Sequence, residues 1–184
     1  MKKFYLLVFS FLIFFLAFNS FSAEIYAQEE NSTASQSSKS ETEIKYELPY
    51  PGLLPDNPLY FLRAIRDRVV SFLISDPLKK AEFNLLQADK RLNAGIYLLN
   101  KGKESLALST VSKAENYFEQ ALGKLREAEK RGQDIGAMQG NLESALEKHE
   151  QELGNLVKKA SVNFKAGFQR EQGRLTNFKE RLSN

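Results

Sequence analysis

The sequence contains no cysteine and no tryptophan, and it has one histidine among 184 residues. Without cysteine the chain can form no disulfide, thiolate metal site, iron–sulfur cluster or thiol intermediate. A site with several imidazole ligands is excluded as well. What is present is a mixed-charge chain with 26 basic and 23 acidic side chains, of a length that suits one ordinary domain.

The first residues have the layout of an export signal. Lys2 and Lys3 precede an uncharged, almost wholly apolar run over residues 4–18. Residues 1–27 are therefore predicted to be a signal peptide, cleaved after Ala27 or Ala23. The run is shorter than the roughly 20 residues of a spanning helix. Extending it to Ala23 approaches that length, so an uncleaved membrane anchor stays open. Both alternatives place the rest of the chain outside the cytoplasm.

Residues 28–44 are polar and serine-rich, with four glutamates against one lysine. Such a segment buries too little apolar surface to offset its ordering entropy. We expect a disordered linker here, followed by a helical domain over residues 45–184.

Four of the five prolines lie between residues 49 and 58. Proline fixes φ and favours extended geometry at the preceding residue, which predicts a stiff strap. Asn57 and Pro58 then suit the N-cap and first position of a helix. The strap's tyrosines, Tyr46, Tyr50 and Tyr60, either pack on the helices or form a ligand for a partner.

The strap and the segment after it resemble the opening of a known family. The run LPYPGLLPDNPLYFL over residues 48–62 is followed by RDR at 66–68 and DPLKKAE at 76–82. This pattern is similar to an exported bacterial domain of unknown function, over roughly residues 46–130. The resemblance implies an all-helical extracytoplasmic domain and supplies no catalytic residues.

Apolar periodicity predicts an all-α fold. Leu62, Ile65, Val69 and Phe72 form one stripe within residues 58–74. Two longer stripes follow, over residues 77–101 and 104–131, and they end at Gly102 and Gly132. The turn at Gly102 is short, so these two helices should be antiparallel neighbours. We predict an antiparallel bundle of three to four helices with a long C-terminal helix.

The C-terminal helix is predicted to begin near Gln133 or Met138 and to continue to about Arg181. Three glycines lie within it, and each lowers the stability of the helix by about 1 kcal/mol relative to alanine. Its distal part is expected to overhang the bundle and to kink or fray, above all over residues 165–184.

His149 lies on the apolar stripe of this helix, where a buried, hydrogen-bonded structural role is expected. Position 153 is leucine, so a second metal ligand of the HExxH type is missing. Position 146 is leucine too, which excludes the Glu-x-x-His pattern of di-iron bundles. We predict no catalytic residue, no metal and no cofactor.

The tail over residues 158–184 carries seven basic and two acidic side chains. A basic amphipathic helix of this kind suits an anionic membrane surface. Packing on the first helix or on a second copy is the alternative, and nucleic acid is not expected for an exported chain. The candidate partner-binding residues of the tail are Lys158, Lys159, Phe164, Lys165, Phe168, Arg170 and Arg174.

Two functions remain after these exclusions. The first is a non-enzymatic exported module that binds an unknown protein or envelope component. The second is a structural spacer at the cell surface that self-associates through its long helix.

Overall fold

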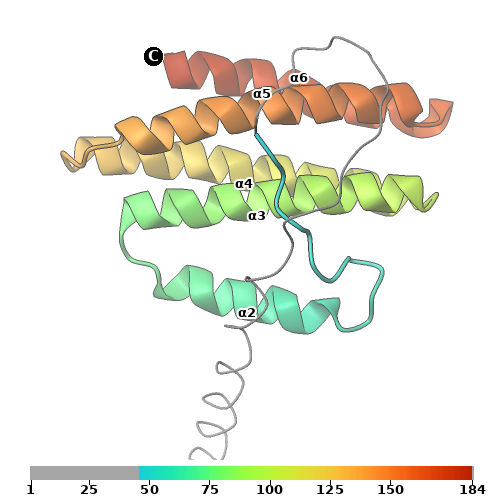
Figure 1. Ribbon diagram of the computed structural model, residues 1–184, viewed down its shortest axis with the longest axis horizontal. Helices are drawn as coiled ribbons and strands as arrows, with labels where there is room; N and C mark the ends of the chain where they lie inside the picture. Colours follow the sequence, from blue (N-terminus) through green and yellow to red (C-terminus); the bar gives the residue numbers. More distant parts are fainter. Residues whose placement is uncertain (1–45, 184) are drawn as a thin grey trace, which may run out of the picture. The chain divides into compact units, whose positions relative to one another are not determined.

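The computed structural model describes residues 46–183. After an irregular segment over residues 46–59, these residues form five helices (Figure 1). The helices are α2 (Tyr60–Leu73), α3 (Pro77–Asn100), α4 (Glu104–Lys130), α5 (Gly136–Lys159) and α6 (Val162–Ser183). The predicted helical bundle is confirmed. The predicted signal peptide and linker lie outside the described residues.

Helices α3 and α4 form the predicted antiparallel hairpin. Gly102 closes its turn with a φ of 73°, a conformation that costs glycine little. The two helices approach closely at Gly95, where an added Cβ would lie 2.4 Å from Cγ2 of Val111. Ala81, Ala88 and Ala107 are fully buried, so small side chains permit the short separation along the hairpin.

The segment that could have formed one helix from residue 133 to 181 is divided into α5 and α6, and the chain reverses between them. The chain leaves the helical conformation at Ala160, with φ −67° and ψ 145°, and α6 packs back against α5 and α4. The carboxylate of Glu104 accepts hydrogen bonds from the backbone N–H and the hydroxyl of Ser161. None of the three glycines, Gly154, Gly167 and Gly173, breaks a helix.

The tail neither overhangs nor frays in this structure. Phe168 is fully buried and Phe178 is 2% exposed. Gly167 lies so close to α4 that an added Cβ would come within 2.4 Å of Cδ2 of Leu108. The apolar side of α6 therefore completes the bundle.

The predicted helix ends are mostly confirmed. Asp76 caps α3 by accepting a 2.9 Å hydrogen bond from the backbone N–H of Lys79, and Pro77 takes the first position. Gly132 ends α4 with a φ of 74°. Helix α2 begins two residues later than predicted, because Asn57 accepts from the N–H of Leu59 within a turn that precedes the helix.

The hydrophobic core is formed by α3, α4, α5 and α6, with Phe118, Leu142, Leu153 and Phe168 among its fully buried side chains. No residue of α2 belongs to this core or to the half-buried shell around it. Within residues 46–183, no helix is both long and apolar enough to cross a bilayer.

Candidate functional site: the outward face of α2

Helix α2 turns its polar side toward the bundle. Asp67 is only 5% exposed, and it is the single acidic residue of the helix. Its carboxylate lies 2.8 Å from Nη2 of Arg66 and 3.7 Å from Nε of Arg63, one helical turn away. Burial and the nearby Arg63 lower the pKa of Lys90 on α3. The contact between α2 and α3 is therefore largely polar and charged.

The apolar stripe of α2 faces away from the bundle. Phe72 is 86% exposed and Leu73 is 71% exposed, values far from those of core side chains. The stripe recognised in the sequence thus exists, but it does not join the hydrophobic core, unlike the usual amphipathic helix. The outward face of α2 consists of Phe61, Leu62, Ile65, Val69, Phe72 and Leu73.

Two exposed arginines border this outward face. At 3.6 residues per turn, its six apolar side chains fall within an arc of about 120°. Arg68 follows at one edge of the arc and Arg66 at the other, and both are exposed. The helix therefore presents an apolar strip with an arginine at each edge.

The strap, residues 46–59, holds α2 in this orientation. Arg63 donates from Nη1 to the carbonyl oxygens of Pro51 and Leu53, the latter at 3.0 Å. Gly52 adopts a φ of 68°, and an added Cβ would lie 3.1 Å from Nη1 of Arg63. On the side of α2 that faces α3, Lys80 donates to the carbonyl oxygen of Ser71. The strap and α3 thus clamp the helix from its polar side.

The strap is itself attached to the α3–α4 hairpin. Asn93 donates to the carbonyl oxygen of Pro49 at 3.0 Å. Near the Gly102 turn, the carboxylate of Asp56 lies 2.8 Å from Nζ of Lys103 and 3.3 Å from Nζ of Lys101. Figure 1 shows the strap crossing α3 on its way to α2.

The start of the strap contacts a buried polar cluster. Tyr46 donates from its hydroxyl to Oδ2 of Asp89 at 2.7 Å. The other carboxylate oxygen of Asp89 lies 3.2 Å from Nε2 of His149, and Nδ1 of His149 lies 2.9 Å from Oε1 of Glu115. His149 and Glu115 are fully buried. The predicted structural role of His149 is therefore confirmed, as part of a four-residue cluster that joins strap, α3, α4 and α5.

Electrostatics favour a protonated imidazole in this cluster. Burial alone would lower the pKa of His149, but Glu115 and Asp89 outweigh it and raise the pKa to about 9. Burial and the charge of Asp89 raise the pKa of Tyr46. Both ring nitrogens of His149 are occupied by hydrogen bonds to carboxylates. Within residues 46–183, no group of acidic or histidine side chains is arranged to hold a metal ion.

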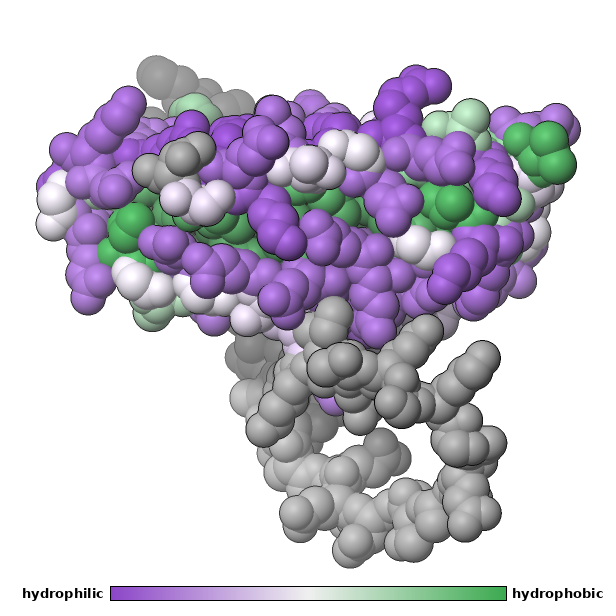
Figure 2. Space-filling model, turned by 90° about the horizontal axis from the view of Figure 1, so that it is seen from above, coloured by the Kyte–Doolittle hydropathy of each residue, from purple (hydrophilic) through white to green (hydrophobic). Residues whose placement is uncertain are grey.

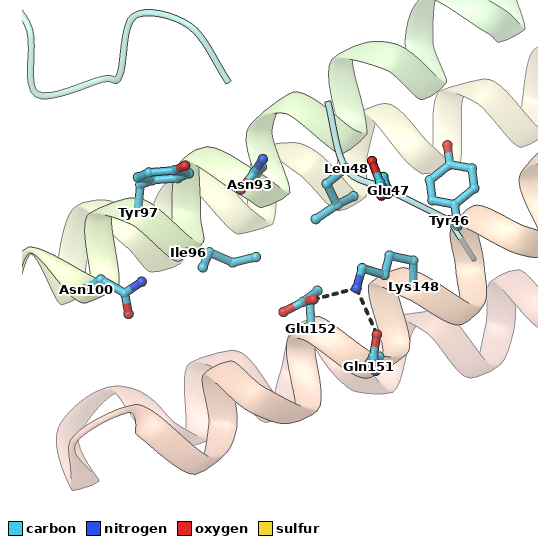
Figure 3. A pocket seen from close by; sticks show the side chains of 10 residues that line it. All are labelled: Tyr46, Glu47, Leu48, Asn93, Ile96, Tyr97, Asn100, Lys148, Gln151 and Glu152. Atoms are coloured by element: carbon cyan, nitrogen blue, oxygen red, sulfur yellow. Dashed lines mark hydrogen bonds and ion pairs between the residues drawn. The ribbon is translucent and has the colours of Figure 1, made fainter. Parts of the chain in front are cut away.

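A polar groove of about 1470 Å³ lies beside the strap, between α3 and α5 (Figure 3). Lys148 spans one of its walls, with Nζ 2.9 Å from both Glu152 and Gln151. Asn93 and Tyr97 line the opposite wall from α3. The groove holds a satisfied ion pair and amides, with no nucleophile paired with a base.

The structure separates the candidate residues of the strap. Tyr46 is half-buried and bonded to Asp89, whereas Tyr50 is 75% exposed and Tyr60 is half-buried. These three tyrosines do not form one surface with the basic tail.

The tail is not a free amphipathic face, because its apolar residues turn inward. Phe168 is fully buried and Phe164 is packed against the core. Arg174 pairs with Glu171 and Glu119 at 2.9 and 3.1 Å. The cations of the tail that remain exposed are Lys158, Lys159, Lys165, Arg170 and Lys179. In Figure 2 the face above α5 and α6 is mainly hydrophilic, with apolar side chains in narrow strips.

Sequence reasoning missed the carboxylates of the cluster. Asp89 lies four residues after Leu85 and three before Leu92, and Glu115 lies four after Val111 and three before Phe118. These spacings place both acids on the buried side of their helices. Acids at such positions need a buried partner, and the single histidine on an apolar stripe was the available signal.

The fold defines an all-α bundle protein that carries one additional helix, strapped on with its apolar face outward. The chain belongs to the DUF5667 family, a domain of unknown function, whose model matches residues 52–163. The resemblance to a domain of unknown function is thereby confirmed, and the match covers α5 and the reversal after it. No curated protein and no solved structure matches the chain.

Proposed function

We propose that the protein is a non-enzymatic interaction module of the cell envelope, and that it binds its partner through the outward face of α2. The observation that carries this proposal is the reversed orientation of α2. An apolar strip is left exposed while the polar side of the same helix, with Asp67 and Arg63, is fixed to the bundle and strap. Contiguous apolar patches on soluble proteins mark interaction sites.

Several features support a binding role over a catalytic one. The imidazole of His149, the one histidine of the chain, is fully buried, and both of its nitrogens are hydrogen-bonded. The groove beside the strap contains Lys148 and Glu152, which satisfy each other. General acid–base chemistry requires a titratable group within reach of a substrate, whereas His149 is out of reach and Lys148 and Glu152 pair with each other.

The proposed location rests on the sequence. Lys2 and Lys3 followed by the apolar run over residues 4–18 have the pattern of an export signal, cleaved or retained as an anchor. Export would place α2 in an extracytoplasmic space, where its partner would be a protein or an envelope component.

The alternative function is a spacer that self-associates. The sequence suggested the long C-terminal helix for this contact. The burial of Phe168 within its own bundle argues against a contact through that part of the helix. A self-associating protein would have to use another surface.

Paired substitutions on α2 test the binding role. Ile65→Gln with Phe72→Gln replaces two exposed apolar side chains, so the free energy of unfolding should change by less than about 0.5 kcal/mol. Binding to isolated cell envelopes should fall sharply. A photo-crosslinker at position 65 should capture envelope material, and one at Ser144 on α5 is the control.

The proposal fails if the double variant is strongly destabilised, because the face would then be structural. It also fails if position 65 captures no more envelope material than position 144 does.

A further inference from the structure

We infer that the outward face of α2 rests on the surface of an anionic lipid bilayer. This inference depends on the proposed binding role of α2 and names the partner. The helix would lie parallel to the membrane plane, with its apolar strip in the boundary between headgroups and acyl chains.

The arrangement of side chains fits a bilayer surface. Ile65 and Val69 lie along the middle of the strip, each more than half exposed, and Phe72 and Leu73 are the most exposed at its C-terminal end. Arg66 and Arg68 border the strip on both sides. Long basic side chains at the edges of an apolar strip can keep their charge at the headgroups while their stems cover apolar surface. Arg66 also pairs with Asp67 at 2.8 Å, so the guanidinium group of Arg68 is the one that would lie at the level of the lipid phosphates.

The charges at the edges also argue against a second copy of the chain. The only acid of α2, Asp67, is buried on the polar side, where Arg63 and Arg66 occupy it. This one carboxylate is shared by Arg63 and Arg66, and Arg68 stands at the other edge, so the helix keeps a net positive charge. Two copies packed face to face would bring arginines toward arginines, whereas paired helices usually carry opposite charges at their flanks. An anionic surface complements this net charge.

The clamp explains how a helix of 14 residues is kept ready for such a surface. Arg63 is bonded to strap carbonyls and Lys80 to the carbonyl of Ser71, so α2 is ordered before it meets a membrane. A helix that is already folded does not lose its backbone entropy on binding. The strap therefore has a role in binding without touching the lipid.

Because the chain contains no cysteine, a fluorophore can be attached at one chosen position. Ile65→Cys in the full chain creates a single thiol for an environment-sensitive fluorophore, and Ser144→Cys on α5 provides the matched control. The probe surfaces are phosphatidylcholine vesicles with and without 30–40% phosphatidylglycerol (roughly the range that gives a strong surface charge). The label at 65 should shift to shorter wavelength and be quenched by brominated acyl chains with the anionic vesicles only. The label at 144 should not respond.

A charge variant tests the edge arginine that makes no ion pair with Asp67. Arg68→Gln should lower the docking equilibrium constant of α2 by about 5-fold, since a basic side chain near such a surface contributes about 1 kcal/mol. Lys158→Gln removes the same charge from the tail and should change docking by less than about 2-fold. Equal effects of the two variants would show a response to net charge and overturn the inference.

Other outcomes separate the two proposals. If the label at 65 stays water-exposed on anionic vesicles while position 65 still crosslinks to an envelope protein, the lipid inference fails and the binding role stands. A blue shift at 65 that grows with protein concentration without vesicles would identify a second copy and overturn the lipid surface. If position 65 contacts neither lipid nor envelope protein, both proposals fail.

Discussion

Nδ1 of His149 on α5 lies 2.9 Å from Oε1 of Glu115 on α4, and both side chains are fully buried. The second ring nitrogen lies 3.2 Å from Asp89 on α3. One imidazole therefore joins three helices of the bundle. Because a buried charge needs a partner, this cluster fixes the relative positions of the helices more specifically than apolar contacts do.

Glu115→Ala should lower the free energy of unfolding by about 3–5 kcal/mol, the usual cost of removing one partner of a buried ion pair. The change removes the contact from Nδ1 of His149 and should also lower the pKa of this histidine. Chemical denaturation measures the first effect and an NMR titration of the single imidazole measures the second. Glu147→Ala, at an exposed position of α5, should change stability by less than about 0.5 kcal/mol. A Glu115→Ala variant as stable as this control would contradict a structural role for the pair.

Stability should fall as the pH rises above neutrality. The pKa of His149 is about 9 in the folded protein, above its ordinary value of 6.5. A raised pKa stabilises the folded state fully below the unfolded value, and this contribution is lost between about pH 6.5 and 9. Denaturant unfolding at pH 6, 7.5 and 9 measures the loss. His149→Gln should show a flatter profile over the same range, and an unchanged slope would refute the assignment.

Tyr46→Phe should loosen the strap without unfolding the bundle. The substitution removes only the hydroxyl that donates to Asp89 at 2.7 Å, and a hydrogen bond to a charged group contributes about 1.5–3 kcal/mol. Faster hydrogen exchange should appear at the backbone amides of the strap, with smaller changes in the α3–α4 hairpin. Tyr50→Phe is the control, because this side chain is 75% exposed. Equal exchange in the two variants would mean that Tyr46 does not hold the strap.

The parts of the fold that could be predicted from the sequence are those with local signals. Asp76 followed by Pro77 and the glycines at 102 and 132 marked helix ends, and the structure places the ends there. The reversal after Lys159 had no comparable signal. Ala160 and Ser161 are compatible with a helix, and the turn depends on Glu104, which is 57 residues away from Ser161. Contacts of that separation are not visible in local periodicity.

The orientation of α2 could not be predicted for a related reason. Periodicity identifies an apolar stripe but not the surface that it faces. The orientation is decided by polar contacts: Arg63 to the strap, and Lys80 to Ser71. The strap and the helix were therefore visible in the sequence, but the outward direction of the apolar strip was not. For the same reason, periodicity could not show that Phe168 of the tail faces the bundle.

Two glycine-to-alanine substitutions should change the free energy of unfolding in opposite directions. Gly95→Ala places a Cβ 2.4 Å from Cγ2 of Val111 and should destabilise the hairpin by about 1–3 kcal/mol through overpacking. Gly123→Ala meets nothing within 4 Å in the middle of α4 and should stabilise by about 0.5–1 kcal/mol, because alanine favours helix more than glycine does. Chemical denaturation of both variants provides the measurement.

A second-site change shows whether overpacking is the cause. Val111→Ala removes the methyl group that the new Cβ would meet, so the Gly95→Ala, Val111→Ala double variant should be more stable than the two separate losses predict. Coupling of this kind identifies a direct contact between the two positions. If the losses simply add, the cost at Gly95 does not come from Val111, and the close approach of α3 and α4 at this point would be refuted.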